Sequence, residues 1–318
     1  MKSFVYYLLS IILRIAFFLT NSLPERAVFN LSKKVSSIYI RSTSRYRRRI
    51  RKNLKIAFGS SYDNQNIENI TRMLANHLGL NLAETLLSGT KNKNTILDRI
   101  SVHGTENLDK VLSHGKGVIA VSAHLGNFTL IGVKMLREGY PFTMLIKEPK
   151  HQGIARVLRK IESEQGGRFI YIDPWSKALR QILNSLRMNE IVCLIADEKK
   201  RRSEIDVEFF GVPAPTAMGP AILSLRTGAP IMPIFIVRNE DLSHQIFIEP
   251  HLKYNPNGNI NEDIYIITTA YTKVIEKYVR MHPNQWSWIN NRWKKRKRKH
   301  LKTNSRNRNI KINSADYK

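Results

Sequence analysis

The sequence predicts an α/β fold in which helices cover a mostly buried sheet. Short apolar runs rich in β-branched and aromatic side chains alternate with longer segments whose apolar residues have helical spacing. Most of the strand-like runs are apolar throughout, which is typical of strands covered on both faces.

The elements follow one another with turn residues between them. Strands are predicted at residues 118–123, 142–146, 168–172, 191–196, 207–210, 231–237 and 245–248. Helices are predicted at residues 128–138, 154–165, 177–187 and 264–281, with one or two more within 61–88. Residues 210–217 are predicted to be a loop, after which Gly219-Pro220 opens a further helix.

Composition limits the setting. The chain has 318 residues, 42% of them apolar, which allows a sizeable core in one main domain with appendages. The 52 Lys and Arg residues against 25 Asp and Glu give a net charge of +27, which favours an anionic partner: a phospholipid surface, a nucleic acid or an acidic carrier protein. The single cysteine, Cys193, lies in an apolar run and is interpreted as a buried strand residue, so no disulfide forms within the chain.

The amino-terminal segment 4–19 is strongly apolar, but it contains Arg14 and falls short of the roughly 20 residues that a spanning helix needs. It is predicted to be a helix lying in the membrane interface. A cleaved signal peptide is the alternative, but no small-residue cleavage site follows, and residues 21–24 look like a helix break with a new cap.

Two basic runs flank the body of the chain, at residues 41–52 and 294–302. A basic run after an apolar helix suits contact with anionic lipid, although it could also be a solvated helix face. We therefore expect a membrane-anchoring helix at 1–22, a main domain at 23–293 and a basic, disordered tail at 294–318. That tail could equally contact RNA.

His124 is the leading candidate for a reactive group. The stretch GVIAVSAHLGNFTL, residues 117–130, leads an apolar strand into this histidine and then into a Gly-Asn turn that opens a helix. The carboxyl end of a strand is where an α/β enzyme tends to place a catalytic base. The alternative is a structural histidine at a strand end.

Four motifs carry a resemblance to a known family: RRRIRKNLKIAFG, VHGTENLDKVLSHGKGVIAVSAHLGNF, VEFFGVPAPTAMGPAILSLRTGAPIMPIFIVR and HPNQWSWINNRWK. With them the chain resembles the lysophospholipid acyltransferase superfamily, in the branch of the lipid A late acyltransferases. The resemblance implies a glycerol-3-phosphate acyltransferase-like α/β sandwich with an amino-terminal membrane-associated helix. It also implies transfer of a fatty acyl chain from acyl carrier protein or coenzyme A to a glycolipid or lysophospholipid hydroxyl, at the cytoplasmic face of the bacterial inner membrane.

The resemblance implies that His124 acts as general base and that no covalent acyl-enzyme forms. The family motif has an Asp or Glu five residues after this histidine, where this chain has Thr129. A hydroxyl brings no negative charge to the imidazole, so another acid is needed. Asp197 is the leading substitute, since it follows the strand at 191–196, and Glu198 is the next; Asp197 could instead cap a turn or pair with residues 199–202.

Other polar residues are expected to contact the substrates. The resemblance assigns Arg159 to a phosphate or the developing oxyanion, although the neighbouring Arg156 and Arg168 leave the register open. Expected substrate contacts are Asn127, Thr129, Arg226 and Arg238. For the two arginines, a surface or salt-bridged role is an equal alternative.

The remaining observations concern partners and cofactors. Trp286, Trp288 and Trp293 form an aromatic and basic segment that suits either a membrane interface or core packing. There is no Walker or dinucleotide glycine motif and no zinc-ligand spacing, so we expect no metal and no cofactor besides the acyl donor. A non-catalytic lipid-binding relative that lost the motif acid is the main alternative, and an RNA-binding protein is a third.

Overall fold

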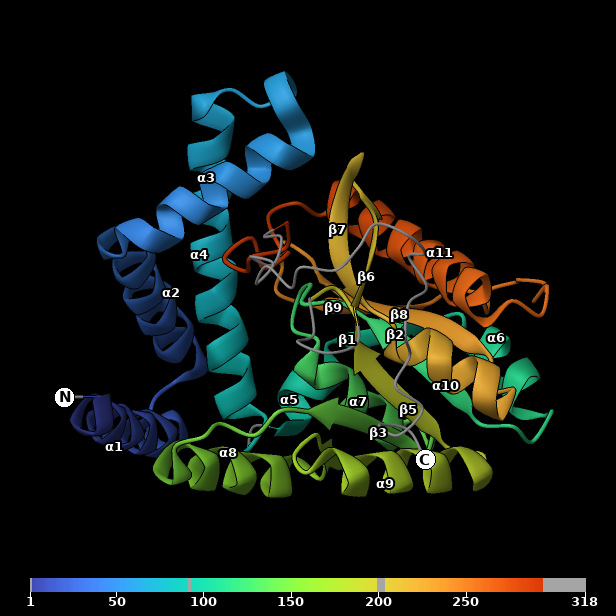
Figure 1. Cartoon of the computed structure of the whole chain (residues 1–318). Helices are drawn as coiled ribbons and strands as arrows, with labels where there is room; N and C mark the ends of the chain where they lie inside the picture. Colours follow the sequence, from blue (N-terminus) through green and yellow to red (C-terminus); the bar gives the residue numbers. More distant parts are fainter. Residues whose placement is uncertain (1, 91–92, 199–203, 294–318) are drawn as a thin grey trace.

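The computed structural model describes residues 2–90, 93–198 and 204–293, and within them the chain forms a mostly parallel central sheet flanked by helices (Figure 1). The seven strands have the order β1-β9-β8-β2-β5-β3-β4, and β9 runs antiparallel to β8 while all other neighbours are parallel. This confirms the predicted α/β class. The strands are β1 (Ile100–His103), β2 (Val118–Ser122), β3 (Phe142–Ile146), β4 (Phe169–Tyr171), β5 (Ile191–Ile195), β8 (Ile231–Arg238) and β9 (His244–Ile248).

Helices surround this sheet and also build an arm beside it, in which α2 packs along α4 (Figure 1). The first helices are α1 (Lys2–Ser22), α2 (Glu25–Ser42), α3 (Ser44–Phe58), a short 3₁₀ turn η1 (Gly59–Ser61), α4 (Asn64–Leu87) and α5 (Lys93–Asp98). The later ones are α6 (Thr105–Leu112), α7 (Thr129–Arg137), α8 (Gln152–Gln165), α9 (Trp175–Arg187), α10 (Gly219–Thr227) and α11 (Ile260–Met281).

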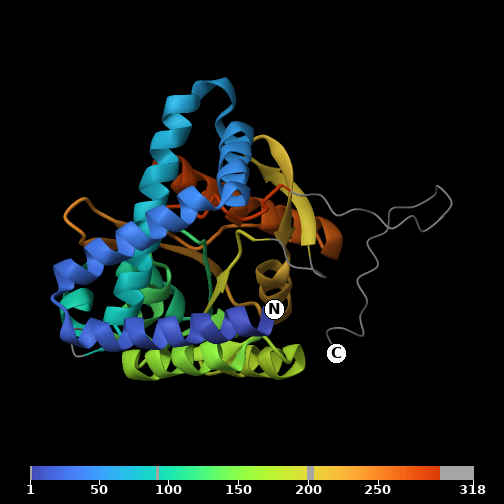
Figure 2. The ribbon, with the colours of Figure 1, turned by 90° about the vertical axis from the view of Figure 1, so that its left-hand side faces the viewer.

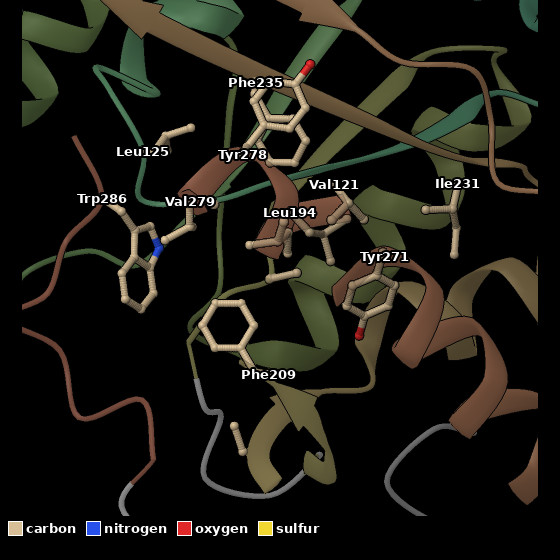
Figure 3. Packing of buried hydrophobic residues seen from close by; sticks show 14 of the residues in the cluster. Val121, Leu125, Leu194, Phe209, Ile231, Phe235, Tyr271, Tyr278, Val279 and Trp286 are labelled. Carbon is tan, nitrogen blue, oxygen red and sulfur yellow. The ribbon is translucent and has the colours of Figure 1, made fainter. Parts of the chain in front are cut away.

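Strand β2 shows how the sheet builds two cores. Its side chains point alternately to opposite faces, so Ile119 and Val121 pack with α9, α10 and α11, while Val118 and Ala120 pack with α6 and α7. Every residue of β2 is buried, which explains its uninterrupted apolar sequence. On the first face, Val121 lies with Leu194 and Tyr271 in a cluster that extends to Phe235, whose ring stacks 4.1 Å from that of Tyr278 (Figure 3).

The structure corrects the loop predicted at 210–217. Residues Val212–Ala217 form strand β7, which pairs antiparallel with β6 (Glu204–Phe209) in a separate hairpin. Strand β7 contains two prolines, Pro213 and Pro215. They stand two residues apart, so both lack an N–H on the same edge, and among the described residues β7 pairs with β6 alone, on one edge.

Strand β1 was not predicted. Of its residues Ile100 alone is buried, because β1 lies at the edge of the sheet against β9. An edge strand with one buried side chain has too little apolar periodicity to stand out in a sequence.

Helix α1 contains the predicted apolar segment 4–19 and ends at Ser22, close to the predicted break. It lies along α8, as Figure 2 shows for the dark blue and yellow-green helices, with Phe17 packed near Val157 and Ile161. No helix of the described ranges is both long and apolar enough to cross a membrane.

The basic run 41–52 extends from the end of α2 into α3. Helix α3 turns Ile50 and Leu54 into the core, while Arg45 and Arg48 are exposed. The second basic run, 294–302, and the whole predicted tail 294–318 lie outside the described residues.

Candidate active site

His124 and Asp197 meet at the carboxyl edge of the sheet. Strands β2 and β5 are parallel neighbours whose last residues, Ser122 and Ile195, are in register. Each polar residue stands two positions beyond its strand end, so the two side chains emerge together. His124 Nδ1 lies 2.8 Å from Asp197 Oδ1, and the backbone N–H of His124 donates to Asp197 Oδ2 at 2.9 Å. One carboxylate therefore holds both the ring and the backbone of His124.

A third donor completes the surroundings of Asp197. Trp286 Nε1 donates to Asp197 Oδ2 at 2.7 Å, and the carboxylate is almost completely buried. Burial opposes the charged form, but the charge of His124 and the hydrogen bonds from His124 and Trp286 outweigh it and hold the pKa of Asp197 below its usual 3.8. Asp197 is therefore an anion at neutral pH.

The other ring nitrogen of His124 is directed away from Asp197. When Nδ1 donates to the carboxylate, Nε2 carries the lone pair that can accept a proton. Nε2 lies 3.8 Å from Glu198 Oε1, and the edge of Phe128 approaches the imidazole with ring centroids 5.0 Å apart. About a quarter of the His124 side chain, 27%, is exposed. This geometry is that of a histidine–carboxylate pair in which Asp197 orients the ring, the arrangement that general-base catalysis uses.

His124 and Glu198 both line a cavity of about 1570 Å³. This volume exceeds the roughly 300–1,000 Å³ of an ordinary small-molecule site. Most of the lining side chains are apolar and come from β3, α8, α9 and α10; they include Met144, Leu158, Ile161, Leu179, Leu183 and Leu223. The cavity is suited to a long hydrocarbon chain beside the imidazole.

Cationic and hydroxyl groups also reach this cavity. Arg159 lines it, half-exposed, and donates to Glu148 Oε1 at 2.6 Å. Arg226, in the last turn of α10, lines it as an exposed side chain. Thr129 lines it as well, but its hydroxyl donates to Asn127 Oδ1 at 2.6 Å and lies 3.2 Å from Thr85 Oγ1. The imidazole N–H is thus taken by Asp197 and not by Thr129.

Asn127 and Arg238, two of the expected substrate contacts, lie away from the cavity. Both side chains are buried and neither lines the cavity. Arg238 donates to Glu84 through Nε at 3.0 Å and through a terminal nitrogen at 2.6 Å, and Asn127 Nδ2 donates to the same carboxylate at 2.9 Å. Arg238 ends β8, which points toward α4, and its guanidinium forms a salt bridge with Glu84. This is the salt-bridged role that the sequence left open as an alternative.

The loop after His124 is fixed by backbone contacts. Ser287 N–H donates to the His124 carbonyl at 3.0 Å, and Gly126 N–H donates to the Gln285 carbonyl at 3.2 Å. Gly126 has φ +55, and a Cβ there would meet the Ile236 carbonyl oxygen at 2.3 Å. Glycine is therefore required by both its conformation and the close approach.

The tryptophan segment is core packing. Trp286, Trp288 and Trp293 are all buried, and the first two pack edge to face with centroids 4.6 Å apart. The interface alternative is therefore wrong for these indoles. Their function in the site, the bond from Trp286 to Asp197, could not be read from the sequence because the partners are 89 residues apart.

Glu84 is the other residue that sequence reasoning missed. It stands on the apolar face of α4 among Leu80, Ala83 and Leu87, all buried. A carboxylate inside such a stripe is unusual enough to be a usable signal. No group of three or more His, Cys, Asp or Glu side chains within the described ranges is arranged to hold a metal ion.

The fold and the His124–Asp197 pair define an α/β protein with an acid-base pair beside a large apolar cavity. The chain belongs to the bacterial lipid A biosynthesis acyltransferases, the family whose sequence model matches residues 2–295. This confirms the resemblance carried by the four motifs.

Individual relatives are distant. The chain is 25% identical to the phosphatidylinositol mannoside acyltransferase of Mycobacterium tuberculosis over 62% of this chain and 60% of that protein. It is 25% identical to the lipid A biosynthesis palmitoleoyltransferase of Escherichia coli over 77% of this chain and 78% of that protein. The lipid A biosynthesis lauroyltransferase of Escherichia coli is 23% identical over 86% of this chain and 87% of that protein. The match thus spans about 60% of the length of the mycobacterial relative.

Proposed function

We propose that the protein transfers a fatty acyl chain from a thioester donor to a hydroxyl of a lipid acceptor, with His124 as general base. The observation that carries this proposal is the His124–Asp197 pair at the wall of the apolar cavity. Membership of an acyltransferase family supports it.

In the proposed reaction, His124 Nε2 takes the proton of the acceptor hydroxyl as its oxygen attacks the thioester carbonyl carbon. The carbon–sulfur bond then breaks, the acyl chain stays on the acceptor oxygen, and the thiolate receives the proton from Nε2. Asp197 stabilises the imidazolium that exists between these two steps. No side chain forms a covalent bond to the acyl group.

The other lining groups contact the substrates in this proposal. Arg159, at the edge of the cavity, holds a phosphate or the developing oxyanion, and Arg226 and Thr129 contact the bound molecules. Both proposed donors, acyl carrier protein and coenzyme A, are anionic, so the net charge of +27 supports recruitment of either one.

The proposed acceptor is a glycolipid resembling a lipid A precursor, or a lysophospholipid. The printed names of the relatives, lipid A and phosphatidylinositol mannoside acyltransferases, favour the glycolipid. The sheet and its helices are proposed to be a glycerol-3-phosphate acyltransferase-like sandwich.

The proposed location is the cytoplasmic face of the bacterial inner membrane. Helices α1 and α2 support it, because Ile15 and Phe18 of α1, and Val35 and Ile38 of α2, are exposed apolar side chains. Arg14 on α1 and Arg41 on α2 are exposed as well. Helices that expose both apolar and basic side chains suit the boundary between headgroups and acyl chains.

The non-catalytic alternative rested on Thr129. Asp197 weakens that argument, because it supplies a buried negative charge to His124 from another strand. The test is to incubate the purified protein with acyl carrier protein and coenzyme A thioesters of several chain lengths and extracted membrane lipids. A lipid heavier by one acyl chain, with release of free thiol, is expected by mass spectrometry. Absence of product with every donor would favour the non-catalytic relative.

A further inference from the structure

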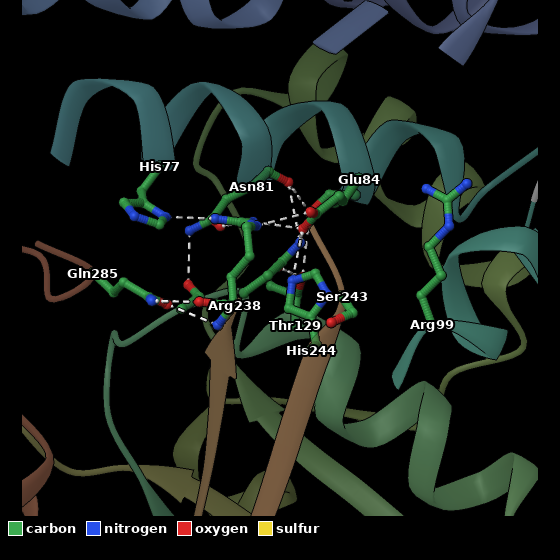
Figure 4. Close-up of polar contacts among 12 residues, drawn as sticks. His77, Asn81, Glu84, Arg99, Thr129, Arg238, Ser243, His244 and Gln285 are labelled. Atoms are coloured by element: carbon green, nitrogen blue, oxygen red, sulfur yellow. Dashed lines mark hydrogen bonds and ion pairs between the residues drawn. The ribbon is translucent and has the colours of Figure 1, made fainter. Parts of the chain in front are cut away.

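A buried polar network joins α4 to the end of β8, and its central residues Glu84 and Arg238 do not line the cavity (Figure 4). Its centre is the carboxylate of Glu84, whose side chain is 1% exposed. Arg238 donates to both oxygens, Asn127 Nδ2 donates to Oε2 at 2.9 Å, and His244 Nε2 lies 3.3 Å from Oε2.

Stability alone gives a poor reason for this arrangement. Taking two charges out of water costs several kcal/mol per ion, and well-packed apolar residues of similar volume often give an equally or more stable core. The neighbours of Glu84 on α4, Leu80, Ala83 and Leu87, are buried and apolar. The network therefore calls for a function that an apolar core would not supply.

The network is bonded to the loop that follows His124. Asn127, which is bound to Glu84, accepts the Thr129 hydroxyl at 2.6 Å, so the carboxylate is linked through one amide to the start of α7. One turn earlier on α4, Asn81 Nδ2 donates to the Gly126 carbonyl at 2.7 Å, and its Oδ1 accepts from Arg238 at 2.6 Å. Two consecutive residues of the His124 loop are thus fixed from the same helix.

We propose that Glu84, held by Arg238, is a positioning residue that sets the His124 loop through Asn127. This inference rests on the proposed function, since the imidazole is what the loop presents to the cavity. Asp197 fixes the loop at His124, and Glu84 fixes it three residues later, so that the imidazole is held from two sides. A shift of about 1 Å at such a group is enough to lower turnover by about 100-fold.

The first test is Glu84→Gln, which keeps the size of the side chain. An amide in place of Oε2 would direct N–H groups at Asn127 or Arg238, both of which are donors there. The expected result is a fall in kcat of roughly 10- to 100-fold with little change in KM, because the variant displaces the base while Glu84 itself does not line the cavity. Hydrogen exchange of the peptide covering residues 124–129 should become faster.

The matched control is Glu276→Gln on α11. Glu276 is likewise a carboxylate paired with an arginine, Arg280, and it accepts the backbone N–H of Phe210 at 2.6 Å, but it does not line the cavity. This variant should change neither the kcat nor the exchange of residues 124–129. The exchange measurement needs no acyl transfer, so it decides the positioning claim even if the proposed function fails.

Asn127→Ala provides a second route that leaves the Glu84–Arg238 pair intact, for the case that Glu84→Gln does not fold. It should lower kcat and speed the loop exchange to a similar extent. In a double variant the two losses should not add, because both act through one contact. Wild-type kcat and wild-type exchange in folded Glu84→Gln or Asn127→Ala protein would overturn the proposal, as would fully additive losses.

Discussion

Replacing Asp197 by asparagine changes one carboxylate oxygen to an amide nitrogen at a side chain that accepts several hydrogen bonds in the site. Three donors converge on this side chain: the backbone N–H of His124, the ring Nδ1–H of His124 and Trp286 Nε1–H. A carboxylate accepts all three, whereas an amide has one acceptor oxygen and adds two donors of its own. At least one of the three donors must lose its partner.

The magnitude follows from this geometry. If the amide N–H₂ faces the ring, Nδ1 becomes the acceptor and the proton moves to Nε2, which can then no longer take a proton from a hydroxyl. The equivalent change in serine proteases lowers turnover by about 10⁴-fold, and we expect about 10³- to 10⁴-fold here. Loss of bonds to a charged acceptor should also lower the free energy of unfolding by about 2 kcal/mol.

The assay is acyl transfer measured across pH, with thermal unfolding in parallel. The variant should transfer more slowly than the wild type at every pH, because the amide supplies no negative charge to the imidazole. Trp286→Phe removes one donor while keeping the charge, so its loss of turnover should be smaller. Wild-type turnover in a folded Asp197→Asn protein would refute the reasoning and leave Glu198, 3.8 Å from Nε2, as the next acid.

Three further predictions concern Thr129, His77 and the association with membranes. Thr129→Glu should not raise transfer, because Asp197 already binds the imidazole, and it should lower the melting temperature, because it removes the hydrogen bond from the Thr129 hydroxyl to Asn127; a tenfold rise in transfer would contradict this. Burial, and then the charge of Arg238, lower the pKa of His77 from 6.5 to about 4. The stability should therefore be full above pH 6.5 and be lost as the pH falls from there through about 4. The free energy of unfolding, measured with urea, should fall by up to about 3 kcal/mol over this range, and His77→Gln should remove this pH dependence. The same dependence of unfolding free energy on pH in the His77→Gln protein would show that His77 is not its source. The protein should sediment with membranes and resist extraction by salt, while Phe18→Ser with Ile38→Ser should release it; recovery of the wild type in a low-salt soluble fraction would reject membrane association.

Local pattern was enough to predict the elements that place His124 and Asp197. Strands β2 and β5 are apolar throughout and are followed directly by polar residues, so the meeting of their carboxyl ends could be expected from a parallel sheet. The hairpin strand β7 could not be predicted, because its two prolines fit a strand solely where one edge has no partner.

The support of the site depends on contacts between distant parts of the chain. Trp286 reaches Asp197 across 89 residues, and Arg238 reaches Glu84 across 154. Nothing in the local sequence of Arg238 distinguishes a substrate-binding guanidinium from one in a buried ion pair. That distinction depends on which helix covers the end of β8, which is set by tertiary packing.

The measurement that tests the central claim most directly is acyl transfer by His124→Asn. The amide keeps a donor group beside Asp197, which also retains the bonds from the residue 124 backbone N–H and from Trp286, but it has no basic nitrogen. His103→Asn, at the edge strand β1, is the control for a histidine outside the site. We expect transfer to fall by at least about 10²-fold in folded His124→Asn protein while the control keeps wild-type activity. Equal transfer by both variants would contradict the assignment of His124 as the general base.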